Sequence, residues 1–131
     1  MLFERDDYCF ACGKENKNGL QLNIEINYGS SHARIEFPHY MQGYTGVVHG
    51  GLISTVLDEL AVYAGISLGG NYATGEITVR FKKPVETGYE YIVKGKVIED
   101  RGKVVNVESL IMDSQDVVYA EANVKLMRIN D

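Results

Sequence analysis

Hydrophobic and polar residues alternate along much of this chain, a pattern typical of β-strands that bury one face. Residues 21–28 carry four apolar side chains at every second position: Leu22, Ile24, Ile26 and Tyr28. Ala33, Ile35 and Phe37 repeat the alternation, so residues 29–31 are predicted to form a hairpin loop. Pro38 should end the second strand because proline cannot donate a hydrogen bond to a β-ladder.

Residues 50–68 follow a helical period instead. The apolar side of this predicted helix consists of Leu52, Ile53, Val56, Leu57, Leu60, Tyr63 and Ala64. Its opposite side consists of small residues and one carboxylate: Gly51, Ser54, Asp58, Ala61 and Gly65. A solvated helix face usually carries Lys, Glu and Arg, so small residues there predict close approach by another backbone, such as that of a second subunit. The glycines at 69 and 70 should end the helix.

Four more strand-like runs come after the helix, at residues 74–82, 89–98, 104–112 and 117–127. Turns are predicted at 101–102 and 113–116. Without a second helix these strands cannot form a doubly wound parallel sheet. The predicted fold class is therefore α+β, with one antiparallel sheet wrapped around one long central helix. Residues 1–131 are expected to form a single domain, with 1–19 as an irregular N-terminal segment.

Composition narrows the range of partners. A hydrophobic fraction of 45% supports a packed core, and a net charge of −5 argues against nucleic acid as the main partner. No apolar run is long enough to span a bilayer, and the acidic N-terminus lacks a signal-peptide core. The expectation is a cytoplasmic protein that binds neither nucleic acid nor membrane.

The two cysteines of the chain, Cys9 and Cys12, form one CxxC motif. A zinc site within one chain needs four ligands, and His32 and His39, the nearby additions, lie in or beside a strand-like segment. A thioredoxin-like role would require the motif at the start of a helix that follows a strand. We expect reduced thiols in an N-terminal turn, without a catalytic role and without a metal; zinc shared between two subunits remains an alternative.

The candidate chemistry lies at the start of the helix. His49-Gly50-Gly51 opens it, and Asp58 follows seven residues after the second glycine. The first N–H groups of a helix lack internal partners and suit a developing negative charge. One element could therefore supply both an oxyanion donor and an acid–base group or nucleophile. The alternative for Asp58, and for its neighbour Glu59, is a solvated helix carboxylate.

Short motifs occur in a fixed order along the chain: Cys9-Phe10-Ala11-Cys12-Gly13 with Gly19-Leu20, Gln42-Gly43, Gly46-Val47-Val48-His49-Gly50-Gly51, Leu57-Asp58-Glu59, and Thr74 to Lys83-Pro84 followed by Gly88. With these motifs the chain resembles, over nearly its whole length, the hot-dog-fold acyl-CoA thioesterases of the phenylacetate-pathway and 4-hydroxybenzoyl-CoA type. The resemblance implies a curved sheet around the helix, homodimers that often pair into tetramers, and active sites at the dimer interface.

The resemblance also implies roles for individual residues. The Gly50 amide would bind the thioester oxygen, Asp58 would act as general base or nucleophile, and Thr74 would hold water or orient Asp58. His49, Gly51 and Gln42 are assigned to substrate binding, with His49 expected mainly to hold the helix start. The alternative role for Thr74 is only to begin a strand.

The implied function is hydrolysis of an acyl-CoA to free acid and CoA, with no metal and no cofactor. One alternative is a module that binds acyl-CoA without hydrolysing it, and another is a hot-dog dehydratase or hydratase, whose motifs this chain lacks. Positive residues near 80–83 could attract a coenzyme A phosphate, although alternating Arg and Lys are more often a solvated sheet face.

Overall fold

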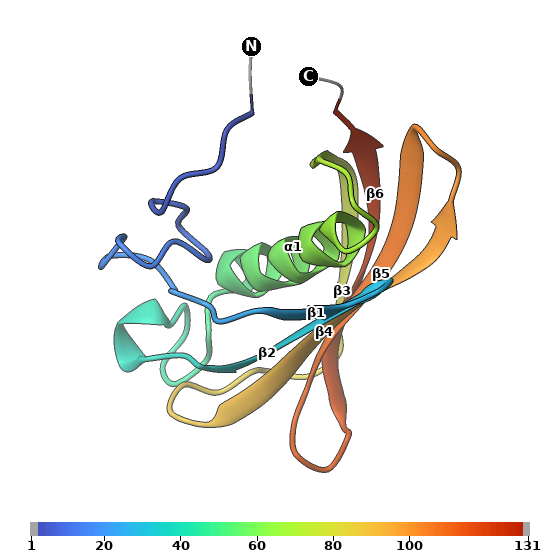
Figure 1. The fold of residues 1–131 in the computed structure, drawn as a ribbon. Helices are drawn as coiled ribbons and strands as arrows, with labels where there is room; N and C mark the ends of the chain where they lie inside the picture. The colour runs from blue at the N-terminus through green and yellow to red at the C-terminus, as the bar shows by residue number, and fades with distance from the viewer. Residues whose placement is uncertain (1–2, 130–131) are drawn as a thin grey trace.

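One antiparallel sheet wraps around one helix in the computed structural model, which describes residues 3–129 (Figure 1). The strands are β1 (Glu25–Asn27), β2 (Ser30–Glu36), β3 (Tyr72–Phe81), β4 (Glu90–Asp100), β5 (Val104–Met112) and β6 (Val118–Arg128). The helix α1 spans Gly50–Ile66, and a short 3₁₀ helix spans His39–Met41. The sheet order is β1-β2-β4-β5-β6-β3 with antiparallel neighbours throughout, so the predicted α+β class is confirmed.

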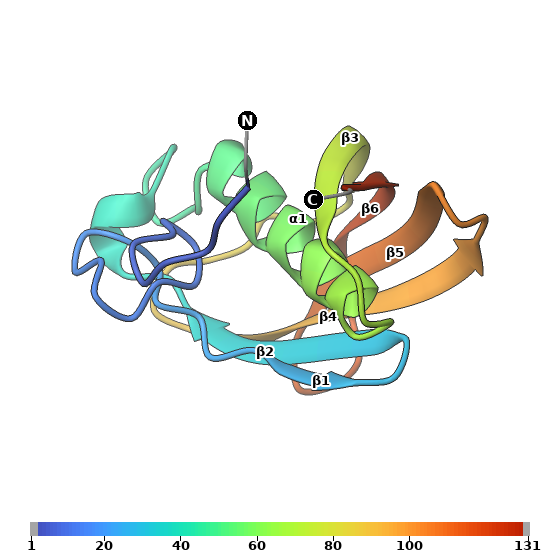
Figure 2. The same cartoon turned by 45° about the horizontal axis from the view of Figure 1, so that its top comes forward.

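The core lies between α1 and the sheet, which curves around the helix (Figure 2). Val56, Leu57 and Leu60 are fully buried on the helix. The sheet covers them with alternate side chains of its long strands, among them Val93, Val105, Val107, Ile111, Val124 and Leu126. The period-two and helical patterns of the sequence therefore meet in one core.

The small-residue side of α1 faces this chain's own sheet over part of its length, which corrects the expected partner contact. Ala61 and Gly65 are buried within the protein. A Cβ atom on Gly65 would lie 2.6 Å from Leu126 Cδ1 and 3.3 Å from Tyr72 Cδ2. The backbone approach that Gly65 permits is thus to β6 and β3. Ser54 and Asp58, which are only half-buried, belong to the more open side of the helix.

The first strand is shorter than predicted. Only Glu25–Asn27 pairs with β2, and all three of its residues are exposed. The preceding residues pair elsewhere, because Leu20 and Leu22 donate their N–H groups to Phe10 and Ala11 of the N-terminal segment. The alternating residues 21–28 therefore divide between two partners: the N-terminal segment and strand β2. The helix also ends two residues before the expected Leu68, and Gly69 follows with a positive φ of 98°.

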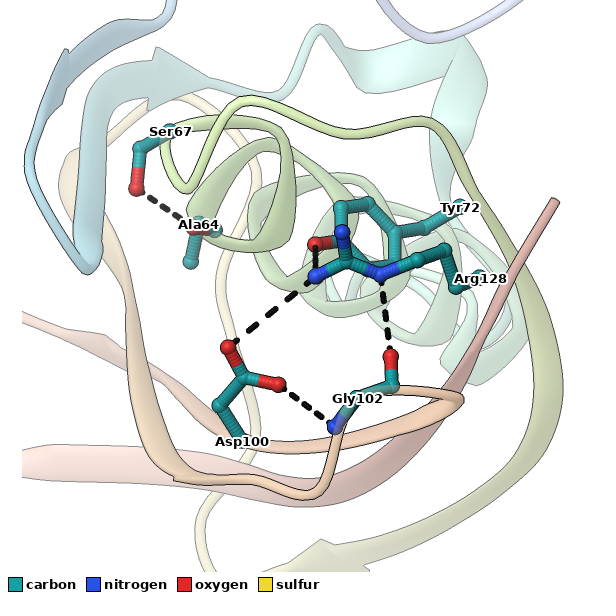
Figure 3. A network of polar contacts seen from close by, with 6 residues as sticks. All are labelled: Ala64, Ser67, Tyr72, Asp100, Gly102 and Arg128. Carbon is teal, nitrogen blue, oxygen red and sulfur yellow. Dashed lines mark hydrogen bonds and ion pairs between the residues drawn. The ribbon is translucent and has the colours of Figure 1, made fainter. Parts of the chain in front are cut away.

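A polar network fixes the beginning of β3 near the end of α1 (Figure 3). The Arg128 guanidinium donates to the Tyr72 hydroxyl at 2.7 Å and to the Gly102 carbonyl at 2.9 Å. It also pairs with the Asp100 carboxylate at 4.0 Å. These contacts tie β3, β6 and the β4–β5 turn together two residues before Thr74.

No helix within residues 3–129 is long and apolar enough to cross a bilayer.

Candidate functional site

The start of α1 is capped by an imidazole. His49 is the N-cap residue, and its Nδ1 accepts the Gly51 N–H at 3.0 Å. The His49 carbonyl accepts the N–H groups of Leu52 and Ile53. Within residues 3–129 the Gly50 N–H donates to no backbone or side-chain acceptor. Gly50 therefore presents an available donor at the positive end of the helix dipole, whereas the Gly51 N–H is already used.

The loop before the helix is held by Gln42. Its Oε1 accepts the Gly46 N–H at 3.0 Å, and Gln42 also forms an isolated β-bridge with Val48. Gly46 has a positive φ of 73°, a conformation that suits glycine. The Gln42 oxygen assigned to substrate binding is therefore occupied in shaping the loop.

A largely apolar groove of about 350 Å³ adjoins Gly50. Its lining residues include Tyr44, Phe81, Lys82 and Lys83. A Cβ atom on Gly50 would lie 3.5 Å from the Phe81 ring, so a substrate group here would reach the helix start beside an aromatic wall.

Two positive residues in or near this groove pair with a carboxylate on the neighbouring strand. Lys82 and Arg80 both pair with the Glu121 carboxylate, at 3.3 and 3.9 Å. Arg80 therefore belongs to a solvated sheet face, whereas Lys82 and Lys83 line the groove.

Asp58 and Thr74 are brought together. The Thr74 hydroxyl donates to Asp58 Oδ1 at 2.6 Å, joining the middle of α1 to the start of β3. The register of β3 against β6 shifts between Thr74 and Glu76, and such bulges re-aim neighbouring side chains. The predicted proximity of Asp58 and Thr74 is thus found, and the Asp58 carboxylate is half-buried instead of fully exposed.

Partial burial sets the acidity of Asp58. Desolvation raises the pKa of its carboxyl above the ordinary value, and the nearby Glu59 charge acts in the same direction. The Thr74 hydrogen bond acts in the opposite direction because it stabilises the ionised form. The result is a carboxylate that is a stronger base than an exposed one.

Gly50 and Asp58 do not meet within one chain. They lie eight residues apart on the same helix, and a rise of about 1.5 Å per residue separates their backbones by about 12 Å. The two groups predicted to act on one thioester are therefore held at different places on this chain.

Glu59 and Tyr63 contact the two N-terminal cysteines, which sequence reasoning missed. Glu59 Oε2 accepts the Cys9 thiol at 3.3 Å, and the Tyr63 hydroxyl donates to Cys12 Sγ at 3.2 Å. The available signal was that Glu59 and Tyr63 are four residues apart and share a helix face. Burial, followed by the hydrogen bond to Glu59, raises the pKa of the Cys12 thiol to about 12, which is unsuited to a nucleophile.

The comparisons with known proteins agree with this architecture. Residues 45–120, more than half of the chain, match a family described as the thioesterase superfamily. Acyl-coenzyme A thioesterase THEM4 of Xenopus laevis is 29% identical over 91 residues, which are 69% of this chain and 41% of that protein. The chain thus spans about two fifths of the length of this curated relative.

Two solved structures illustrate the shared fold. The PaaI protein from the phenylacetic acid degradation operon of E. coli has a TM-score of 0.80 at 20% identity, covering 85% of this chain and 81% of its own. A hypothetical thioesterase with coenzyme A from Streptococcus pneumoniae TIGR4 has a TM-score of 0.78 at 18% identity, covering 84% and 90%. At these identities the likeness establishes the hot-dog fold.

Proposed function

Because the chain belongs to the thioesterase superfamily, we propose that it is an acyl-CoA thioesterase. The observation that carries this proposal is the half-buried Asp58, held by Thr74, on a helix whose first N–H is an available donor. A module that only binds acyl-CoA would not need a carboxylate held in this way.

The proposed chemistry divides between two groups. The Gly50 amide would stabilise the oxyanion that forms when the thioester carbonyl is attacked. Asp58 would take the proton of the attacking water or attack the carbonyl itself, and its raised pKa suits the first role. The Thr74 hydroxyl would fix the carboxylate through Oδ1 and leave Oδ2 for the reacting atom.

We further propose that each site is shared between two protomers. During hydrolysis, the carbonyl oxygen of a thioester and the atom that attacks its carbon lie within about 3 Å of each other. Along the helix, however, about 12 Å separates Gly50 from Asp58. A Gly50 amide from one protomer and Asp58 of the partner subunit would remove this mismatch. The edge strand β3 carries Thr74 and offers an unpaired backbone edge to a second copy.

The substrate would enter through the groove beside Gly50. Its apolar wall suits an acyl or pantetheine chain, and Lys82 and Lys83 would attract a coenzyme A phosphate. The coenzyme A in the Streptococcus pneumoniae structure supports this ligand class.

Purified protein is expected to release free CoA from at least one member of a panel of short-, medium- and long-chain and aromatic acyl-CoAs. Release would be followed with a thiol reagent, and binding of the same compounds by calorimetry. Saturable binding without thiol release across the panel would favour the non-catalytic module instead.

Thr74→Val should shift the acidic limb of the kcat/KM profile to higher pH. The Thr74 hydroxyl lowers the pKa of Asp58, so its removal raises that pKa further and protonates the base at a higher pH. Thr74→Ser keeps a hydroxyl and is the matched control, with a profile close to wild type. An unchanged acidic limb in Thr74→Val would show that Asp58 is not the titrating base.

A further inference from the structure

The cysteine motif forms a tight turn whose two sulfurs lie on one side. The Gly13 N–H donates to the Cys9 carbonyl at 2.8 Å, and the Cys12 N–H donates to Cys9 Sγ at 3.5 Å. A Cβ atom on Gly13 would lie 2.4 Å from the Asp7 carbonyl and 2.5 Å from the Cys9 nitrogen. Only glycine fits this position, so the backbone itself brings the two sulfurs together.

The turn is docked against α1 through the carboxylate of Glu59. The N-terminal segment runs alongside the helix (Figure 1), where Glu59 contacts Cys9. The two sulfurs and a Glu59 oxygen all lie within 4.8 Å of one another. In a tetrahedral zinc site, bonds of about 2.0–2.3 Å place neighbouring ligand atoms about 3.5–3.8 Å apart. Shortening the longest of these distances by about 1 Å would give that geometry. The distance from Cys9 Sγ to Glu59 Oε2 is already 3.3 Å.

Hydrogen-bond donors reach both sulfurs. Cys9 Sγ accepts the Cys12 N–H, and Cys12 Sγ accepts the Tyr63 hydroxyl at 3.2 Å. The Arg5 guanidinium lies 5.0 Å from the centre of the Tyr63 ring, whose hydroxyl contacts Cys12. Hydrogen-bond donors that orient and stabilise ligand atoms are typical of metal sites.

We propose that Cys9, Cys12 and Glu59 bind one zinc ion, with water as the fourth ligand. Thiolates select zinc over magnesium or calcium, and a cavity of about 370 Å³ lined by Cys9 and Glu59 gives water access. The proposal departs from the expectation of reduced thiols without a metal, because Glu59, and not His32 or His39, lies beside the two cysteines. The ion would clamp the N-terminal segment to α1, beside Asp58, and this role does not depend on thioester hydrolysis.

The test is metal binding by the full chain, kept reduced and shown by thiol titration to contain two free thiols. Wild type should bind one Zn²⁺ in competition with a chromophoric chelator. Co²⁺ should give thiolate-to-metal charge-transfer absorption and the intense visible bands of tetrahedral coordination. Zinc should also raise the midpoint of thermal unfolding.

Glu59→Gln, nearly isosteric, should weaken zinc binding at least about tenfold, and Cys12→Ser, which leaves one thiolate, should weaken the cobalt charge-transfer absorption. Glu76→Gln, an exposed carboxylate on β3, is the matched control and should bind as wild type does. Reduced, folded wild-type protein that takes up neither ion would overturn the site. Equal affinity in Glu59→Gln and wild type would overturn the three-ligand assignment.

Discussion

Replacing Asp58 with Asn should lower kcat/KM about 100-fold or more while the protein stays folded. Asn is nearly isosteric and can still accept the Thr74 hydrogen bond, so the contact between α1 and β3 should survive. What it cannot do is take a proton or attack a carbonyl. Near-normal thioesterase activity in folded Asp58→Asn protein would remove Asp58 from the proposed mechanism.

The same substitution should stabilise the fold at neutral pH. Burial raises the pKa of Asp58, so the folded state favours the protonated carboxyl more than the unfolded chain does. The stability due to this preference is present below the ordinary pKa of Asp and is lost as the pH rises through the raised value. The Asp58→Asn protein does not lose stability in this way, because Asn does not ionise.

Thermal unfolding across pH would test this linkage. The midpoint of Asp58→Asn should exceed that of wild type at neutral pH, and the difference should shrink as the pH falls below about 4. A variant that gains stability while losing activity would fit a catalytic carboxylate held in a costly environment. A midpoint difference that does not depend on pH would contradict the raised pKa.

The architecture could be predicted because its two periodicities are strong and seldom conflict. Alternating side chains marked the four strands after the helix to within about two residues, and the apolar side of α1 was recognised from its helical spacing. The exception is the region before β2, where Leu22 is buried although it lies outside any strand. Leu22 contacts the N-terminal segment, whose sequence has no periodic pattern from which this contact could be predicted.

The candidate site was predictable only where its groups are linked through one helix and the next strand. Asp58 and Thr74 belong to adjacent elements, and their pairing follows from the α1–β3 connection. Glu59 instead meets a cysteine 50 residues earlier, and Gly65 meets Leu126 at the far end of the chain. Contacts between residues so far apart in the sequence depend on the complete tertiary fold. Small residues on a helix therefore predict that some backbone comes close, but not which one.

Gly50→Pro should lower turnover about 10²–10³-fold, because proline removes the N–H proposed to bind the oxyanion. The fold should tolerate the change, since proline is favoured at the first position of a helix. The preceding His49 already has the extended φ of −58° and ψ of 132° that a following proline requires. Gly50→Ala adds a side chain but keeps the N–H, so it is the matched control and should retain most of the activity. Equal losses in both variants would indicate obstruction of the groove instead.

Mixing the two inactive proteins should then restore activity if each site is shared between protomers. In a heterodimer of Gly50→Pro and Asp58→Asn chains, one site carries both substitutions. The other combines an intact Gly50 amide with an intact Asp58. After free exchange of subunits, an equimolar mixture should recover about a quarter of the wild-type activity, since half of the dimers are mixed and each has one intact site. Exchange would be verified by native mass spectrometry of differently tagged chains. If mixed dimers form and stay inactive, the Gly50 amide and Asp58 do not act together across a two-fold interface, and the two-chain site is wrong.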